Sequence, residues 1–259
     1  MSNADQILVS ERFTGASWVT INRPKKHNAL SEAVLSELTA TIQTQGKRPE
    51  IKCIVLTGAS DRYFAAGGDL AALAHVRDTA DVLEMTDKSR AALDTIRNCD
   101  VPVIALLNGS AIGGGAELAL SCDMRMQRQG VKIGYIQAKL GITSAWGGGV
   151  DLVQLVGPSR AVRMMSRCEL IDADTALAWG LADKIIGPQD PEKDIQEFLE
   201  PILATPRQVL QGIKAQARAF RRGDTYSERR LVEQQHLVET WLHQDHWDRA
   251  ENLLSRGKK

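Results

Sequence analysis

Two glycine-rich segments carry the residues with the clearest chemical potential in this chain. The first is FAAGGDL at residues 64–70, and the second is NGSAIGGGAEL at residues 108–118. Each segment follows a short apolar run, at residues 53–57 and 103–107, and each precedes a predicted helix. A glycine turn at the start of a helix leaves backbone N–H groups without partners. Two such turns side by side can direct two N–H groups at one oxygen atom, which is the arrangement of an oxyanion hole.

Composition narrows the classes of function. The chain has 259 residues, enough for a sizeable core, and its formal net charge is +0. This balance gives no bulk attraction to nucleic acid or to an anionic membrane. No apolar run is long enough for a membrane span, and the polar N-terminus carries no signal-peptide core. The cysteines are widely spaced without a C-x-x-C motif, which is typical of a reduced protein, so we expect a cytoplasmic location.

The remaining pattern predicts an α/β protein. Short β-type runs at residues 7–9 and 18–21 predict a hairpin, and a helix follows from the N-cap Ser31 to about residue 44. Further helices are predicted at residues 80–96, 147–156, 159–166 and 172–178. From Pro191 onward the pattern is almost wholly helical, and strands alternating with helices before such a tail favour an α/β domain with a helical C-terminal region. The expected breaks in the tail are Pro201, Pro206 and Gly223.

In combination, these motifs resemble those of the crotonase superfamily, the enoyl-CoA hydratase/isomerase group. The resemblance extends from about residue 7 to the C-terminus. It rests on the segments 23–30, 65–70, 102–105, 108–118, 122–123, 147–148 and 173–183. It implies a crotonase-type spiral of ββα units over residues 5–190 and a helical C-terminal trimerisation region over residues 191–259. Self-association as a trimer, or as a hexamer built from two trimers, is also implied.

The resemblance further implies a coenzyme A thioester whose carbonyl oxygen meets two backbone N–H groups. In this sequence those N–H groups belong to Gly68 and Gly114. The CoA moiety is expected against Lys25, Lys26, His27, Ala66, Asp69 and Leu70. Taken by itself, Asp69 is more typical of a helix N-cap than of a catalytic acid. Neither a metal nor a redox cofactor is implied, and CoA enters only as part of the substrate.

Hydration of an enoyl thioester needs acid–base groups as well as an oxyanion hole. The hydratases of this family resemble each other in using two glutamates, of which the first matches Glu117 and the second falls on Gln137. A glutamine cannot usefully accept or give a proton at neutral pH. The aspartate shared by the dienoyl isomerases falls on Ala145. Glu117 is therefore the single acid–base candidate, although a glutamate near a helix start also fits a structural capping role.

One carboxylate and an oxyanion hole suit decarboxylation of a malonyl-type thioester, because loss of CO2 generates the enolate without a base. The segment 141–148 is also similar to that of the ethylmalonyl-CoA/methylmalonyl-CoA decarboxylase branch. We therefore expect a lyase that decarboxylates a short malonyl-type acyl-CoA. The candidate donors to the substrate carboxylate are Gln137, Thr143 and Trp146. An enoyl-CoA hydratase with a single glutamate and a Δ-enoyl-CoA isomerase stay open.

A non-enzymatic alternative is an RNA-associated crotonase-like protein without catalytic activity. Its motivation is the missing second carboxylate together with a basic stretch in the tail. That stretch contains Arg218, Arg221, Arg222, Arg229 and Arg230. RNA binding of this kind falls steeply with salt. The even charge balance and the intact glycine segments favour the enzyme, with a small-molecule acyl-CoA as partner and neither nucleic acid nor membrane.

Overall fold

The structure, a computed structural model, describes residues 5–256, and the polar residues 1–4 lie outside that range. It contains a six-stranded and a four-stranded sheet. In spatial order the larger sheet is formed by β1 (Ile7–Phe13), β2 (Ala16–Ile21), β3 (Cys53–Gly58), β5 (Val103–Leu107), β7 (Met124–Arg128) and β10 (Lys184–Ile186). The smaller sheet is formed by β4 (Tyr63–Ala65), β6 (Ser110–Ile112), β8 (Ile133–Gly134) and β9 (Leu170–Ile171).

Successive stretches of the chain each add one strand to both sheets and then a helix. Strands β3 and β4 lead to α2 (Thr79–Arg97), β5 and β6 lead to α3 (Gly114–Ser121), and β7 and β8 lead towards α4 (Gly148–Val156). Strands β3, β5 and β7 are parallel neighbours in the larger sheet, and β4, β6 and β8 are parallel neighbours in the smaller one. Each unit therefore repeats the same ββα step one strand further along. This arrangement confirms the spiral of ββα units that the family resemblance implies.

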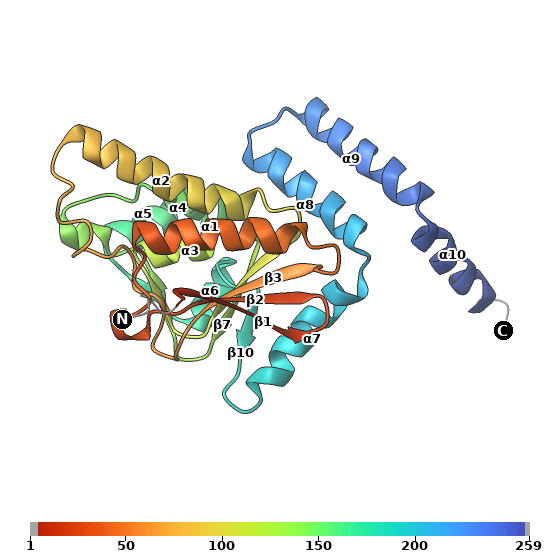
Figure 1. Ribbon diagram of the computed structural model, residues 1–259, viewed down its shortest axis with the longest axis horizontal. Coiled ribbons are helices and arrows are strands. Elements are labelled where there is room, and N and C mark those ends of the chain that lie inside the picture. Colours follow the sequence, from red (N-terminus) through yellow and green to blue (C-terminus); the bar gives the residue numbers. More distant parts are fainter. Residues whose placement is uncertain (1–4, 257–259) are drawn as a thin grey trace.

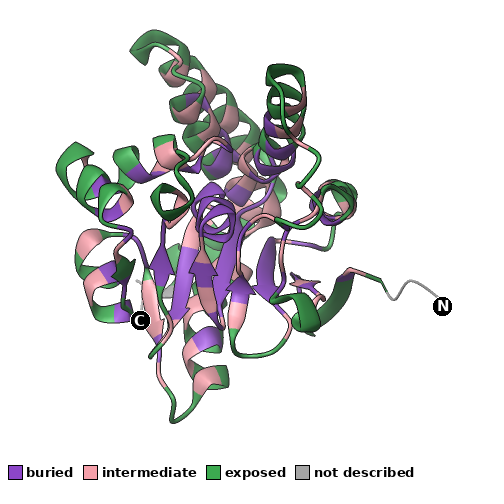
Figure 2. Ribbon diagram, turned by 90° about the vertical axis from the view of Figure 1, so that its left-hand side faces the viewer, coloured by how far each residue is buried: buried purple, intermediate pink, exposed green. Residues whose placement is uncertain are grey.

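The central strands of the larger sheet are buried between two layers of helices and are purple in Figure 2, whereas the edge strand β1 is mostly exposed. Side chains on a strand point alternately to its two faces. Ile54 and Leu56 of β3 accordingly join the apolar cluster that includes side chains of α1 (Glu32–Lys47). Val55 joins the opposite cluster, which includes side chains of α7 (Pro191–Ala204). Burial on both faces explains why β3 and β5 are continuous apolar runs in the sequence.

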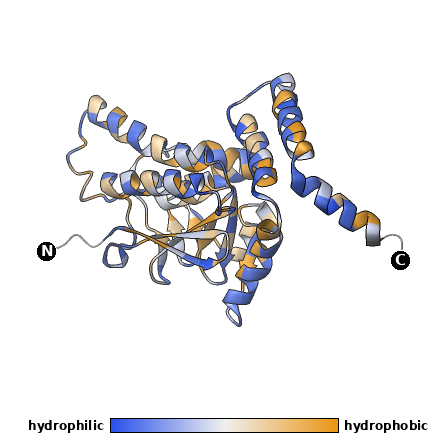
Figure 3. Ribbon diagram, turned by 45° about the vertical axis from the view of Figure 1, so that its right-hand side comes forward, coloured by the Kyte–Doolittle hydropathy of each residue, from blue (hydrophilic) through white to orange (hydrophobic). Residues whose placement is uncertain are grey.

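The C-terminal helices form an arm beside the sheets. The remaining helices are α5 (Pro158–Ser166), α6 (Ala173–Trp179), α8 (Arg207–Arg221), α9 (Tyr226–Leu242) and α10 (Gln244–Arg256). Figure 1 shows α9 alongside α8 and α10 extending away from the sheets, and Figure 3 shows apolar and polar stretches alternating along this arm. Exposed apolar side chains on it include Leu231, Leu237, Trp241, Leu242, Leu253 and Leu254. Among the described helices, none combines the length and apolar character that crossing a membrane requires.

The predicted hairpin, the Ser31 N-cap and the helix at residues 80–96 are confirmed. Other expectations were wrong. Two three-residue strands, β4 and β6, were not predicted: they lie between the predicted strands, which are present as β3 and β5, and the glycine turns, and they are too short to show periodicity. Turns at residues 70–75 follow the first segment in place of a helix. Pro201 lies inside α7 and does not end it, whereas Pro206 and Gly223 do flank α8.

Candidate active site

The two glycine turns lie side by side at the carboxyl ends of β4 and β6, which are parallel neighbours. Gly67 has a φ of +100° and Gly113 has a φ of +57°, backbone conformations that favour glycine. A Cβ atom on Gly67 would lie 3.2 Å from the backbone nitrogen of Gly114, and one on Gly115 would overlap the carbonyl of Ala65. The absence of side chains at these positions therefore lets the two turns pack directly against each other.

Among the described residues, the N–H groups of Gly68 and Gly114 donate hydrogen bonds neither to a neighbouring strand nor within a helix. Leu30 pairs with the backbone on both sides of Gly68: its N–H donates to Gly67 at 2.8 Å, and its carbonyl accepts from Asp69 at 3.1 Å. In a parallel bridge of this kind the N–H of Gly68 points away from Leu30. Gly114 is the first residue of α3, where an N–H has no acceptor within the helix. Within residues 5–256, neither N–H group has a hydrogen-bond acceptor.

Glu117 lies on α3 one turn beyond Gly114, and its side chain is almost completely buried. Its Oε2 atom accepts hydrogen bonds from the N–H groups of Trp146 at 2.9 Å and Gly148 at 3.1 Å. Its Oε1 atom accepts one from Nε2 of Gln137 at 2.9 Å. Burial raises the pKa of the Glu117 carboxyl, although these donors act in the opposite direction. The capping role considered from the sequence is wrong, because the carboxylate reaches forward to the loop at residues 145–148.

Two arginines of α2 anchor that loop. Arg90 donates from Nε to the carbonyl of Ala145 at 2.8 Å. Arg97 forms an ion pair with Asp151 at 2.6 Å, and a Cβ atom on Gly147 would lie 3.0 Å from its guanidinium. Sequence reasoning missed both arginines, because an arginine on a helix is usually an exposed charge and gives no sign of the carbonyl or carboxylate that it meets.

A buried tyrosine fixes the other side of the loop. The hydroxyl of Tyr135 donates to the carbonyl of Gly148 at 2.6 Å. Burial, followed by the nearby charge of Glu117, raises the pKa of Tyr135 well above its ordinary value, so the hydroxyl stays a neutral donor. A Cβ atom on Gly148 would overlap the backbone and side chain of Glu117. Tyr135 was not singled out from the sequence, where a tyrosine between Gly134 and Ile136 carries no specific signal.

Gln137 lies beside Glu117 at the start of a 3-10 turn, η2 (Gln137–Leu140). Its Nε2 atom donates to Glu117, and its Oε1 atom is buried without a partner among the described residues. Gln137 and Thr143 both line a cavity of about 340 Å³, named here the Thr143 cavity. Its other lining residues are Tyr135, Ala138, Ile142, Ser144, Val162, Met165 and Ser166. Within the part of the chain that the structure describes, the lining of this cavity includes no charged side chain.

From the sequence, Trp146 is a candidate donor to the substrate carboxylate together with Gln137 and Thr143, but in the structure Trp146 does not line the Thr143 cavity. It is buried and lines a different cavity of about 340 Å³, named here the Leu73 cavity. Other lining residues of the Leu73 cavity include Leu30, Leu35, Leu73, Val76, Met85, Lys88 and Ala92. The six-membered ring of Trp146 packs on both glycine turns. A Cβ atom on Gly114 would lie 2.5 Å from its Cζ3 atom, and one on Gly68 would lie 3.6 Å from its Cη2 atom.

The segment proposed to contact CoA lies against the first glycine turn. The N–H of Ala66 donates to the carbonyl of His27 at 3.1 Å, and the side chains of Lys25 and Lys26 are exposed. Leu70 is 61% exposed at the rim of the turn. These residues therefore present two cations and an apolar side chain to solvent beside the glycine turn.

Asp69 binds other protein groups rather than solvent. Its carboxylate forms an ion pair with Arg23 at 3.0 Å and accepts from the N–H of Ala72 at 3.4 Å. Burial acts to raise the pKa of Asp69, but the hydrogen bonds from Arg23 and Ala72 outweigh it and lower the pKa. Asp69 thus caps a turn and ties the first glycine turn to the preceding segment.

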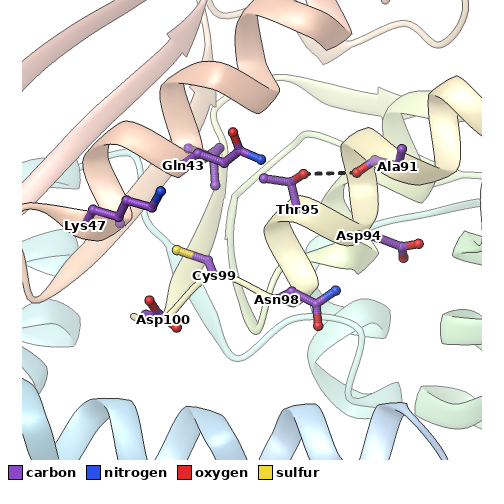
Figure 4. A pocket seen from close by; sticks show the side chains of 10 residues that line it. Gln43, Lys47, Ala91, Asp94, Thr95, Asn98, Cys99 and Asp100 are labelled. Carbon is purple, nitrogen blue, oxygen red and sulfur yellow. Dashed lines mark hydrogen bonds between the residues drawn. The ribbon is translucent and has the colours of Figure 1, made fainter.

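A cavity of about 460 Å³ lies between the C-terminal ends of α1 and α2, as Figure 4 shows. Its polar lining residues are Gln43, Lys47, Asp94, Thr95, Asn98, Cys99 and Asp100. The Thr95 hydroxyl donates to the carbonyl of Ala91 in its own helix at 3.0 Å. No residue of the glycine turns or of the loop at residues 145–148 lines this cavity, so it is distinct from the candidate active site.

The basic stretch that motivated the RNA alternative contacts the protein itself. Three of its arginines form ion pairs and the other two lie over aromatic rings. The ion pairs are Arg218–Asp100 at 2.8 Å, Arg221–Asp123 at 2.9 Å and Arg222–Asp224 at 2.5 Å. The ring contacts are Arg229 over Phe220 and Arg230 over Tyr226. Arg218 and Arg221 therefore tie α8 to Asp100 and Asp123 of the sheet-bearing part of the chain.

Comparison with known proteins supports the same family. The sequence profile of the enoyl-CoA hydratase/isomerase family matches residues 12–253. A Syntrophomonas wolfei protein named crotonyl-CoA hydratase is 32% identical over 81% of this chain and 80% of its own length. A Rattus norvegicus protein named ethylmalonyl-CoA decarboxylase is 28% identical over 98% of this chain and 83% of its own. The crystal structure of an enoyl-CoA hydratase from Bacillus anthracis, 25% identical, covers 97% of each chain with a TM-score of 0.90. The chain therefore belongs to the enoyl-CoA hydratase/isomerase family of the crotonase superfamily.

Proposed function

We propose that this protein is a CoA-thioester lyase that decarboxylates a short malonyl-type acyl-CoA. The observation that carries the proposal is the hydrogen-bonded pair of Glu117 and Gln137. Hydration by two carboxylates would need a second group that exchanges protons, and here the neighbour of Glu117 is an amide. Decarboxylation needs only one proton donor, because cleavage of the carbon–carbon bond generates the enolate without a base.

In the proposed reaction, the thioester oxygen accepts hydrogen bonds from the N–H groups of Gly68 and Gly114. The bond between the α-carbon and the carboxylate breaks, CO2 leaves, and the electron pair forms the enolate. The two N–H donors stabilise the charge that develops on the oxygen, and they act more strongly on the enolate than on the thioester. Protonated Glu117 then donates to the α-carbon and regains a proton from solvent. One malonyl-type thioester and one proton thus give one acyl-CoA and one CO2.

The Thr143 cavity supports this reaction through its lack of charge. Among the described residues, its lining offers the hydroxyls of Thr143, Ser144 and Ser166 but no cation, while Nε2 of Gln137 is engaged by Glu117. A carboxylate in such surroundings is poorly solvated, whereas neutral CO2 carries no comparable penalty, so loss of CO2 relieves the desolvation. We assign the leaving carboxylate to this cavity, with Thr143 as its donor.

A second candidate function is hydration of a short enoyl-CoA with Glu117 as the single acid–base group. The buried Oε1 atom of Gln137 favours it, because an unpartnered acceptor beside Glu117 can bind a water molecule through one of its hydrogens. Glu117 would then remove a proton from that water. A relative named crotonyl-CoA hydratase also supports this candidate.

A side-by-side assay with methylmalonyl-CoA, ethylmalonyl-CoA and crotonyl-CoA distinguishes the two candidates, with products identified by mass spectrometry. We expect loss of CO2 from the malonyl-type thioesters and no addition of water to crotonyl-CoA. Glu117→Gln should lower decarboxylation on the order of 10²-fold while CoA-thioester binding is retained. Addition of water to crotonyl-CoA without release of CO2 would establish the second candidate and refute the first.

We also propose that the arm formed by α8, α9 and α10 joins copies of this chain into a trimer or hexamer. Large exposed apolar side chains such as Leu237, Trp241 and Leu253 support this assembly, because apolar patches of this kind usually mark an interface. Size-exclusion chromatography with light scattering should give the mass of three or six chains. A monomeric mass at working concentration would refute the proposal.

A further inference from the structure

Trp146 connects the Leu73 cavity to both glycine turns. Its indole is 7% exposed and forms part of the cavity lining. A Cβ atom built on Gly114 would lie 2.5 Å from this ring, and one built on Gly68 would lie 3.6 Å from it. Leu73 completes the contact, since its Cδ1 atom would lie 3.2 Å from a Cβ atom on Gly68. One wall of the cavity is therefore formed by an aromatic ring that packs on both turns.

We infer that Trp146 is a specificity-determining residue that limits the acyl chain to a few carbons beyond the thioester. This inference rests on the proposed binding of a CoA thioester by the N–H groups of Gly68 and Gly114. An acyl group bound there begins where the indole lies, and the ring occupies the space through which a longer chain would extend into the Leu73 cavity. The lining beyond the ring combines apolar side chains, such as Met85 and Ala92, with charged ones at Glu32, Asp81, Glu84 and Lys88. The apolar side chains offer a hydrocarbon chain a surface to pack on once that space is open.

The structure separates the role of the Trp146 side chain from that of its backbone. Glu117 is bound by the backbone N–H of Trp146, which every substitution except proline keeps. The loop itself is held through the carbonyl of Ala145 and through Asp151, neither of which depends on the indole. Shortening the side chain should therefore change the space available to the acyl chain without removing the donors to Glu117.

The test is calorimetric binding of butyryl-, hexanoyl- and octanoyl-CoA to the full-length protein and to Trp146→Ala and Trp146→Phe. The wild type should bind octanoyl-CoA at least tenfold more weakly than butyryl-CoA. Trp146→Ala should reverse this order, because added methylenes then become buried in the Leu73 cavity. Trp146→Phe, which keeps an aromatic ring and so guards against a folding defect, should fall between the two. The matched control is Trp179→Ala, since Trp179 lies on α6 outside both cavities.

The outcomes separate this inference from the proposed function. The same dependence of affinity on chain length in the wild type and in both Trp146 variants would overturn the role of the indole, even if the protein decarboxylates its substrates. A shift that also occurs in Trp179→Ala would overturn it as well. A shift confined to the Trp146 variants, in a protein that releases no CO2, would support the inference and refute only the proposed reaction.

Discussion

Replacing Gln137 by glutamate places a second carboxylate next to Glu117 and tests the central argument directly. In the structure, Nε2 of Gln137 lies 2.9 Å from Oε1 of Glu117, and Glu117 is buried. Two unit charges about 4 Å apart repel by about 4 kcal/mol at an effective dielectric constant of about 20. Since one pKa unit corresponds to about 1.4 kcal/mol, the upper pKa of the pair should rise by about 3 units. The variant should therefore share one proton between its two carboxyl groups at neutral pH.

Two measurements follow from this shared proton. A raised pKa in the folded state contributes stability below the ordinary glutamate pKa, and that contribution is lost as pH rises through the raised value. The melting temperature of Gln137→Glu should therefore fall further below that of the wild type between about pH 5 and pH 8. In parallel, hydration of crotonyl-CoA should increase on the order of 10²-fold, because an acid and a base are then both present.

The matched control is Gln129→Glu. Gln129 donates to Asp174 at 3.2 Å, as Gln137 donates to Glu117, but on the exposed surface. Solvent screens that pair, so its effect should stay below about 1 kcal/mol at every pH. Equal pH profiles for the two variants would show that Gln137 and Glu117 are not in buried contact. Equal hydration by the wild type and Gln137→Glu would refute the argument that the missing carboxylate selects the reaction.

Two further perturbations test the roles of other buried charges. Decarboxylation should decline as pH rises through the raised pKa of Glu117, because only the protonated carboxyl can donate a proton. The measurement is kcat/KM as a function of pH. A rate that rises with pH over this range would instead assign Glu117 as a base. Lys214→Met should lower the free energy of unfolding in urea by about 1–3 kcal/mol, because Asp123 loses its buried partner at 2.6 Å and keeps only Arg221, at 2.9 Å, as a cation among the described residues. The exposed pair Lys193–Glu197 provides the control, with an expected loss below about 1 kcal/mol for Lys193→Met.

Much of the fold was predictable because its main elements carry local patterns. β3 and β5 are continuous apolar runs, since parallel strands buried on both faces need apolar side chains at every position. α2 has helical periodicity and an acidic N-cap. β4 and β6 were missed because each has only three residues, too few to show a period of two. Their place in the sheet depends on pairing with distant strands, which no local pattern encodes.

By itself, the sequence determined which chemical groups are available to the candidate site: paired glycine turns, the carboxyl of Glu117 and the amide of Gln137. These are matters of residue type and local order. Only the tertiary structure decided which atoms meet. Glu117 is bound by N–H groups 29 and 31 residues further along the chain, and the ring of Trp146 rests on glycines from two different turns. The loop at residues 145–148 that makes both contacts is held by Arg90, Arg97 and Tyr135, and such long-range packing leaves no periodic trace in the sequence.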